Sequence, residues 1–164
     1  MKPTCRMSCS ACCYDNPHGV TAFELLYIYE MIKDRSSFSE VREQLGQRYK
    51  DFQNLRKEKG RSNLQINWKK KRNPCVFLDE KQQCSIYERR PVACRMFFSL
   101  TSPEFCEPTH PEFESAINPH LEPSSAIKDL LKKISYEQNI ADVPKDLISG
   151  MYQMIKKMEQ RHSD

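Results

Sequence analysis

The chain has 164 residues, a formal net charge of +4 and 8 cysteines. This length is enough for one domain with a hydrophobic core and short for two independent ones, so we expect a single cysteine-cluster domain over residues 1–164. The first residues carry no apolar signal segment, and no run reaches the roughly eighteen apolar residues of a membrane span. We therefore expect a cytoplasmic protein with no membrane partner.

A buried helix is predicted directly after residue 21. Thr21 and Glu24 have the spacing of a capping box, in which two side chains satisfy backbone groups at a helix start. Apolar residues then follow on nearly every side of this helix. Tyr27 and Tyr29 are therefore expected to be core or boundary aromatics rather than functional groups.

A second, longer helix is predicted from Ser37 to about Gly60. Ser37 and Glu40 repeat the capping-box spacing, and glycine is the residue most often found just after a helix end. Between them, apolar residues recur at helical spacing and form a narrow stripe. These residues are Val41, Leu45, Phe52 and Leu55.

The pattern changes between residues 67 and 100. Two short apolar runs, 75–78 and 84–87, flank a polar turn and predict a small hairpin or a pair of extended loops. Pro91 suits the first turn of a short helix, while the prolines that follow keep the chain largely irregular. We expect that irregular stretch to wrap the cysteine site. Its prolines are Pro103, Pro108, Pro111, Pro119 and Pro123.

Two helices are predicted near the C-terminus. Ser124 or Ser125 caps the first and Pro144 opens the second, and each carries an apolar face that we interpret as core packing. The faces comprise Ile127, Leu130, Leu131 and Ile134 in the first helix, and Leu147, Ile148, Met151, Ile155 and Met158 in the second. The predicted fold is mainly α, a small α+β arrangement in which a helical shell surrounds a cysteine-rich metal centre with one short hairpin or extended-loop pair.

The cysteines fall in two groups. Cys5, Cys9, Cys12 and Cys13 lie near the start, and Cys75, Cys84, Cys94 and Cys106 lie from the middle onward. In a reducing compartment, clustered cysteines are more often metal ligands or redox thiols than disulfides. We predict that all eight bind zinc or iron, the latter including an iron–sulfur cluster, because sulfur-only ligation suits both metals.

Within the first group, Cys9 and Cys12 have the CxxC spacing whose tight turn brings two sulfurs to one side. Cys5 stands one residue further away, a spacing that still allows convergence. The adjacent Cys12 and Cys13 project differently, so we expect them to serve different metals or to bridge a cluster. The alternative is that one of the two is a buried small hydrophobic residue.

The later group has no CxxC pair. Cys75 and Cys84 begin the two apolar runs, where a hairpin would bring their sulfurs together, and Cys94 would approach from the short helix. Cys106 lies in the proline-rich stretch and is either a ligand or a partly exposed spare thiol. Among the histidines, only His18 is close enough in sequence to be a reserve ligand, since no HxxxH or HExxH motif is present.

Several arginines flank the cysteines. Arg6, Arg89, Arg90 and Arg95 would offset an anionic thiolate cluster, receive a carboxylate or phosphate, or serve ordinary packing and ion pairing. Two divalent ions bound by eight deprotonated thiols would bring the net charge of +4 to zero, so the basic excess is consistent with a cysteine metal site.

The densest basic run spans residues 69–72. Such runs are usually solvated faces, and we interpret this one so. The alternative is nucleic-acid binding, with bases stacking on Trp68. Metal ions are the expected partners, nucleic acid is not expected, and the sequence names no partner protein.

The motifs together resemble a known family. The chain has the pattern CxxxCxxCC at its start, then Cys75-Val-Phe-Leu, then Cys84-Ser-Ile-Tyr-Glu-Arg-Arg-Pro-Val-Ala-Cys94-Arg-Met-Phe. This set, over residues 5–32 and 74–106, is similar to the bacterial cysteine-cluster proteins of the CxxCxxCC or YkgJ type, described as zinc- or iron-chelating domains. The first spacing is one residue longer than the family's usual CxxC, and Ser10-Ala11 stand where a glycine is common.

The resemblance implies metal binding by the cysteines and no settled reaction. A flagellin lysine methylase, which uses S-adenosylmethionine, is similar through this cysteine motif. It implies, as an alternative, a methylase-like enzyme with an iron–sulfur cluster. Against that alternative, the chain has only 4 glycines and none of the glycine-rich loops that bind nucleotides or S-adenosylmethionine. The sequence therefore establishes no enzyme and no catalytic residue.

Overall fold

The computed structural model describes residues 4–5, 9–60, 63–107, 109–113, 125–137 and 145–161. Within these ranges the regular structure is helical and no strand is present, which confirms the mainly α prediction. The α-helices are α1 (Ala22–Ile32), α2 (Phe38–Lys59), α3 (Leu64–Lys70), α4 (Val92–Arg95), α5 (Ser125–Glu137) and α6 (Leu147–Arg161). The 3-10 turns of the described residues are η1 (Ala11–Tyr14), η2 (Tyr87–Arg89) and η3 (Pro103–Cys106).

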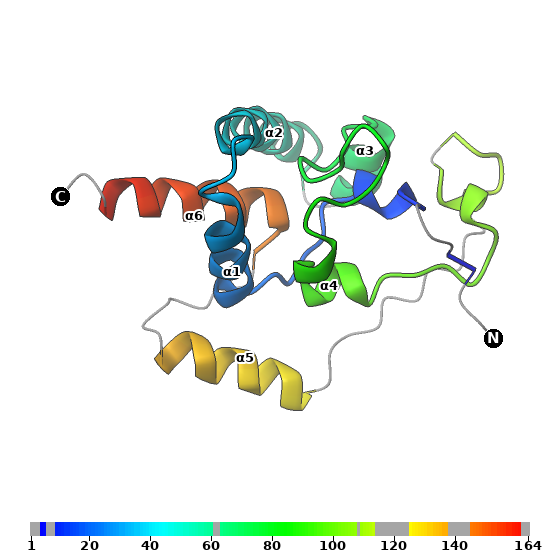
Figure 1. The fold of residues 1–164 in the computed structure, drawn as a ribbon. Coiled ribbons are helices and arrows are strands. Elements are labelled where there is room, and N and C mark those ends of the chain that lie inside the picture. The colour runs from blue at the N-terminus through cyan, green and yellow to red at the C-terminus, as the bar shows by residue number, and fades with distance from the viewer. Residues whose placement is uncertain are drawn as a thin grey trace.

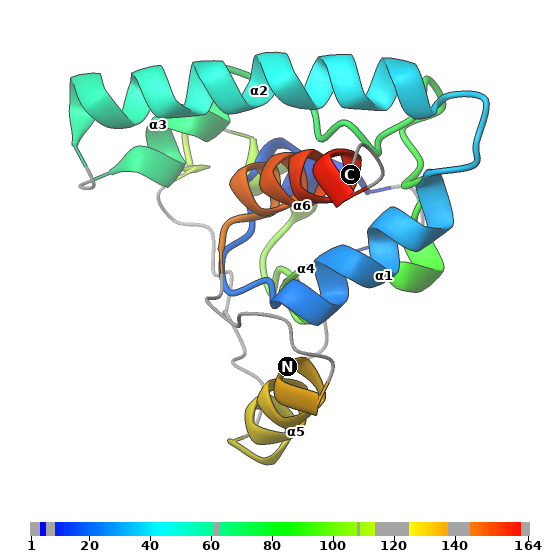
Figure 2. The same cartoon turned by 90° about the vertical axis from the view of Figure 1, so that its left-hand side faces the viewer.

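Helix α6 lies between α1 and α2 and packs against both (Figure 1, Figure 2). Their facing apolar side chains form the main core, and removing each large side chain from water stabilises the fold by about 1.5–3 kcal/mol. The buried residues include Leu25, Ile28, Ile32, Leu45, Met151 and Ile155. Phe77 and Ile86 belong to the same core, although they come from the loops that carry Cys75 and Cys84. The cysteine loops are thereby anchored to the helices.

The capping box at the start of α1 is present as predicted. Thr21 Oγ1 accepts a hydrogen bond from Glu24 N at 3.3 Å, and Thr21 N donates to Glu24 Oε2 at 2.8 Å. The other oxygen, Glu24 Oε1, accepts from Val92 N at 2.7 Å. One carboxylate thus caps α1 and holds the first turn of α4, the helix that carries Cys94. The tyrosine prediction is confirmed for Tyr29, which is buried, but it is wrong for Tyr27, which is 46 % exposed.

Helix α2 begins and ends where the sequence predicts, but the predicted capping box at its start is absent. Ser37 makes no side-chain hydrogen bond to the helix start. Its backbone (φ −80°, ψ 0°) lies in a turn closed by the bond from Phe38 N to Arg35 O, whereas a capping serine needs an extended backbone. At the other end, Gly60 has φ +66°, a conformation that glycine adopts without strain.

The segment around Cys75 and Cys84 forms a pair of extended loops. One isolated antiparallel bridge joins Leu78 to Cys84, and Asp79 N donates to Gln83 O at 2.9 Å. The Asp79 carboxylate also accepts from Lys81 N and Gln83 N, which closes the turn through its side chain. The pairing is too short for strands, so the structure shows the extended-loop alternative. Beyond it, Pro91 precedes the short helix α4 as predicted.

The prediction that both C-terminal helices pack in the core is wrong for α5. This helix contacts α1, and in both views it lies away from α2, α3 and α6 (Figure 1, Figure 2). Leu130 is 57 % exposed and Ile127 is also exposed, while Leu131 and Ile134 are half-buried. An amphipathic pattern specifies that a helix has an apolar face, but not what covers that face.

Helix α6 buries its predicted face, with Leu147, Met151 and Ile155 in the core and Ile148 and Met158 packed beside them. No helix in the described part of the chain is long and apolar enough to cross a membrane. Some predictions fall on residues outside the described ranges and are not compared. These residues are Arg6, Pro108, Pro119, Pro123, Ser124 and Pro144.

Candidate metal centre

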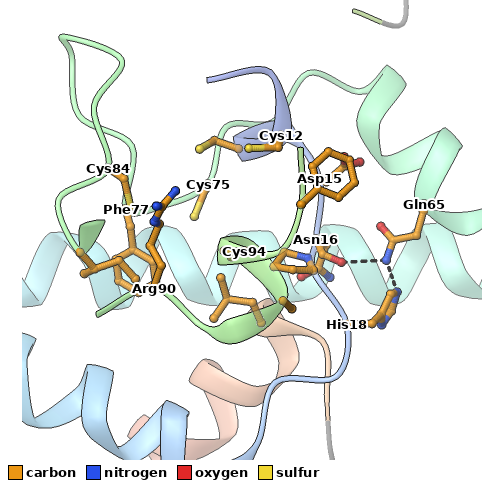
Figure 3. Close-up of a pocket in the computed structure, with 16 residues that line it drawn as sticks. Cys12, Asp15, Asn16, His18, Gln65, Cys75, Phe77, Cys84, Arg90 and Cys94 are labelled. Atoms are coloured by element: carbon orange, nitrogen blue, oxygen red, sulfur yellow. Dashed lines mark hydrogen bonds between the residues drawn. The ribbon is translucent and has the colours of Figure 1, made fainter. Parts of the chain in front are cut away.

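Cysteines from both halves of the chain line one cavity of about 230 Å³. Figure 3 shows the side chains of Cys12, Cys75, Cys84 and Cys94 around it. The five cysteines in its wall are Cys12, Cys13, Cys75, Cys84 and Cys94. Apolar residues complete much of the wall, including Phe77, Ile86, Ala93, Phe97 and Leu147. None of the eight cysteines, all of which lie in described residues, forms a disulfide.

Backbone contacts bring the two cysteine groups together. Cys12 and Cys13 lie on η1, and Cys13 O accepts a hydrogen bond from Cys75 N at 2.7 Å. This bond joins the first cysteine group directly to the first cysteine of the later group. Cys84 enters through its bridge with Leu78, and Cys94 through α4.

Asn16, which the sequence analysis did not single out, fixes the chain just after the cysteine pair. Its fully buried amide donates from Nδ2 to Asp146 Oδ1 at 2.8 Å, and its Oδ1 accepts from Ile148 N at 3.1 Å. Asp146 Oδ1 also accepts from Ser149 N, so these contacts cap α6. The segment carrying Cys12 and Cys13 is therefore tied to the start of α6. No sequence motif marked Asn16 for this role.

Burial raises the pKa values of four thiols in the cavity, those of Cys12, Cys75, Cys84 and Cys94. The pKa of Cys12 is raised, first by its hydrogen bond with the Cys13 side chain and then by burial. Burial raises the pKa of Cys75 to about 12, and burial together with Cys12 and Cys84 raises that of Cys94 to about 12. The pKa of Cys84 is raised by burial as well. These thiols hold their protons at neutral pH unless a cation replaces them.

Arg90 is the arginine that lines this cavity. Its guanidinium stacks on the Tyr87 ring at 3.8 Å from the centroid, and its Nε donates to Tyr87 O at 3.2 Å. The positive charge lowers the pKa values of Cys12, Cys84 and Cys94, against the effect of burial. Of the predicted arginines, Arg90 has the geometry to offset thiolates. Arg89 instead lies over Tyr27 at 4.4 Å.

The remaining cysteines gather at a different place, around Ser99. Cys5 Sγ accepts a hydrogen bond from Ser99 N at 3.2 Å, and the Ser99 side chain is hydrogen bonded to Cys106. Burial raises the pKa of Cys106, the hydrogen bond from Ser99 lowers it, and Cys5 and Cys9 raise it. Cys106 is only 4 % exposed, so it is not the partly exposed spare thiol that we considered. In the sequence, the signal that Ser99 would be buried was its position between two apolar residues, Phe98 and Leu100.

The basic run 69–72 is not a solvated face throughout, which corrects the prediction. Lys69 is only 5 % exposed, and its Nζ lies 3.2 Å from Asp15 Oδ2. Arg72 pairs with Glu107 and stacks over the Tyr14 ring at 4.5 Å. The run therefore ties α3 to loops that carry cysteines, a role that its composition does not reveal.

The alternative interpretation of this run was nucleic-acid binding with bases stacked on Trp68, and the position of Trp68 does not allow that stacking. It is 1 % exposed and packs edge-on against Phe52, with ring centroids 5.2 Å apart. No face of its ring is open, so a base cannot stack on it.

The donor atoms fit zinc or iron in type, because converging thiols are the ligands that both metals take. In the described residues no three Cys, His, Asp or Glu side chains are arranged so that they could hold a metal ion as they stand. The cavity is also larger than one ion needs, since about 10–15 Å³ is enough for a single water molecule. His18 lines the cavity and contacts Gln65 Nε2 through its ring.

The helical fold and the shared thiol cavity define a class of protein, the small α-helical cysteine-cluster proteins. The family model CxxCxxCC, described as "Putative zinc- or iron-chelating domain", matches residues 4–115, and the chain belongs to this family. The resemblance stated from the motifs is thereby confirmed. No curated protein and no solved structure matches the chain.

Proposed function

We propose that this chain is a metal-binding protein whose cysteine side chains hold zinc or iron. The observation that carries the proposal is the cavity of about 230 Å³ in which Cys12 and Cys13 meet Cys75, Cys84 and Cys94. These positions are far apart in sequence, and the fold brings their five thiols into one largely apolar wall. The proposed ligands comprise all eight cysteines: Cys5, Cys9, Cys12, Cys13, Cys75, Cys84, Cys94 and Cys106.

The size of the cavity supports a centre with more than one metal atom, or a metal ion together with a second small ligand. Either would fill space that a single ion leaves empty. Arg90 supports the same proposal, because a fixed positive charge beside the thiols stabilises their deprotonated, metal-binding form. We place the protein in the cytoplasm, where a reducing environment keeps such thiols available.

Metal analysis tests the proposal. The chain is purified without oxygen, and its absorption spectrum and metal content are measured. Iron–sulfur chemistry gives a brown protein with charge-transfer bands, and zinc gives a colourless one with about one ion per four thiolates. We expect Cys75→Ser and Cys94→Ser to lose bound metal, because each removes a thiol from the cavity.

The matched control is Ala93→Ser, which places the same hydroxyl group in the wall of the same cavity without removing a thiol. We expect this variant to retain its metal. Metal content equal to wild type in both cysteine variants would contradict the proposed ligands, and a wild-type chain that binds neither zinc nor iron would contradict the function itself.

A further inference from the structure

Four arginines gather around residues 85–90, the segment that leads to α4. We call them the arginine surface, and they are Arg35, Arg89, Arg90 and Arg95, each half-buried or exposed. Arg35 Nη1 donates a hydrogen bond to Ser85 O at 3.3 Å, and Arg95 Nε donates to Arg90 O at 2.9 Å. Arg95 Nη2 also donates to Glu88 O. Backbone carbonyls of one short segment therefore hold two of the four guanidiniums.

Aromatic rings hold the other two guanidiniums of the arginine surface. Arg89 lies over the ring of Tyr27 on α1, 4.4 Å from the centroid, and Arg90 lies over the ring of Tyr87 at 3.8 Å. Both tyrosines are exposed. The four side chains are thus fixed before anything binds to them, which lowers the entropy that a partner must overcome on binding.

The positive charge of the arginine surface is not neutralised within the part of the chain that the structure describes. None of its guanidiniums forms an ion pair with a carboxylate there, whereas Arg42 pairs with Glu159 and Arg72 pairs with Glu107. The surface therefore presents fixed positive charge to the solvent. Guanidiniums bind carboxylates through paired N–H donors, so acidic side chains complement this surface.

The composition of the surface favours a protein partner over nucleic acid or a small anion. Arginine and tyrosine are enriched at protein–protein interfaces and among the residues that contribute most to binding there. A stacked base needs an open ring, but Tyr27 is stacked on Phe23 and covered by Arg89. Arg89 lies toward α1, whereas Arg90 lines the cavity on the side of Cys84 (Figure 3). Charges spread in this way match an extended acidic segment better than a single anion.

From these contacts we infer that the arginine surface is the docking site for an acidic segment of a partner protein, one that presents several Asp or Glu side chains. Arg90 belongs both to this surface and to the cavity wall, so the docked segment lies beside the thiols. The inference goes beyond the proposed function and does not depend on it, because the arginines keep their charge with or without metal.

Binding of an acidic peptide tests the inference. A fluorescein-labelled peptide of alternating glutamate and glycine is titrated with the full chain, and fluorescence anisotropy gives the dissociation constant. We expect binding that weakens as salt is added, because salt screens exposed charges, and no binding of the matched peptide with glutamine in place of glutamate. Arg89→Gln and Arg95→Gln should each weaken binding of the acidic peptide by about two- to fivefold, and the double variant should weaken it by about tenfold.

The matched control is Arg56→Gln, which removes the same charge from the last turn of α2, at the end of that helix away from α1 and α4 (Figure 2). This variant should bind the peptide as wild type does. Arg89→Lys keeps the charge but not the planar fork, and should bind between wild type and Arg89→Gln. If Arg95→Gln does not fold by far-UV circular dichroism, Arg89→Gln decides the result, since that side chain lies over an exposed ring.

The outcomes separate this inference from the proposed function. Equal affinity of wild type and Arg89→Gln for the acidic peptide overturns the docking site, and so does an equal loss in Arg56→Gln, which would show an effect of net charge alone. Tighter binding of a labelled single-stranded oligonucleotide, weakened by the same arginine variants, also overturns it. Metal content should be unchanged in Arg89→Gln and Arg95→Gln, because neither residue lines the cavity. A chain that binds metal but not the peptide overturns the inference and leaves the proposed function standing, and a chain that binds the peptide but no metal does the reverse.

Discussion

At the scale of single residues, the buried charge of Lys69 is the least expected feature. Lysine is rarely enclosed unless it is paired, and here its partner Asp15 lies two positions after Cys13. Burial raises the pKa of Asp15, while the charge and hydrogen bond of Lys69 lower it, so the carboxylate depends on its partner. Lys69 also lies 5.5 Å from the centroid of the Phe113 ring. The pair joins α3 to the segment that follows the first cysteines.

We expect Lys69→Met to lower the free energy of unfolding by about 3 kcal/mol, because it leaves the Asp15 carboxylate buried without its cation. Lys70→Met is the matched control, since Lys70 is the exposed neighbour in the same helix, and its effect should stay within about 0.5 kcal/mol. Urea denaturation measures both variants.

Adding Asp15→Asn to Lys69→Met removes the unpaired charge and should recover part of the lost stability. Equal stability of Lys69→Met and Lys70→Met would show that the pair contributes nothing to the fold.

At the scale of elements, the packing of α6 on α1 positions the cysteine loops. Gly150 lies where α6 approaches α1 most closely, since a Cβ placed there would meet Leu25 Cδ1 at 2.6 Å and Cδ2 at 3.0 Å. Leu25 is buried, so its side chain has little room to move. Glycine is unfavourable within a helix, yet here it permits two helices to pack closely. The same α6 begins at the contacts with Asn16, directly after the cysteine pair.

Gly150→Ala is expected to destabilise the protein by about 1 kcal/mol, because overpacking against Leu25 outweighs the gain in helix propensity. Gly46→Ala is the control within α2, where the new Cβ would meet only the Tyr152 ring, at 3.9 Å. That variant should be stabilised by up to about 1 kcal/mol. Thermal unfolding of both measures the difference.

The cause can be checked in a second background. The cost of Gly150→Ala should shrink when Leu25 is also replaced by alanine, because the contact is then gone. A stabilised Gly150→Ala variant would mean that the two helices separate without cost.

At the scale of the whole molecule, the structure has a helical core and a cysteine-rich side. The core of α1, α2 and α6 is apolar. From the loops between α3 and α4, the core takes Phe77 and Ile86 as buried residues, and Cys75, Val76 and Cys84 pack against it while only partly buried. Short loops with few buried apolar side chains gain most from a metal that links them. Metal binding should therefore stabilise the cysteine-rich side more than the helices.

Removal of metal with a chelator, under reducing and oxygen-free conditions, is expected to lower the melting temperature while leaving most of the far-UV circular dichroism of the helices. A ligand present at a hundred times its dissociation constant stabilises the folded state by about 2.7 kcal/mol, which sets the scale of the effect. Limited proteolysis should then cut first between residues 70 and 91. An identical melting temperature and cleavage pattern with and without metal would argue against a structural contribution.

Local patterns predicted much of the fold because helix starts and apolar periodicity depend on near neighbours. Thr21 with Glu24, the stripe through Leu45 and Phe52, and the end at Gly60 all follow from interactions within a few residues. Ser37 failed as a capping residue because a turn sets its backbone, and α5 failed as a core helix because its pattern does not specify what lies opposite.

The sequence by itself determined the helices and the family, because capping, periodicity and cysteine spacing are properties of short segments. Only the tertiary structure decided which cysteines share a cavity, that Ser99 gathers two others, and that Lys69 is buried beside Asp15. Those features depend on contacts between positions tens of residues apart. Such contacts arise when the chain buries its apolar faces, and no local pattern encodes them.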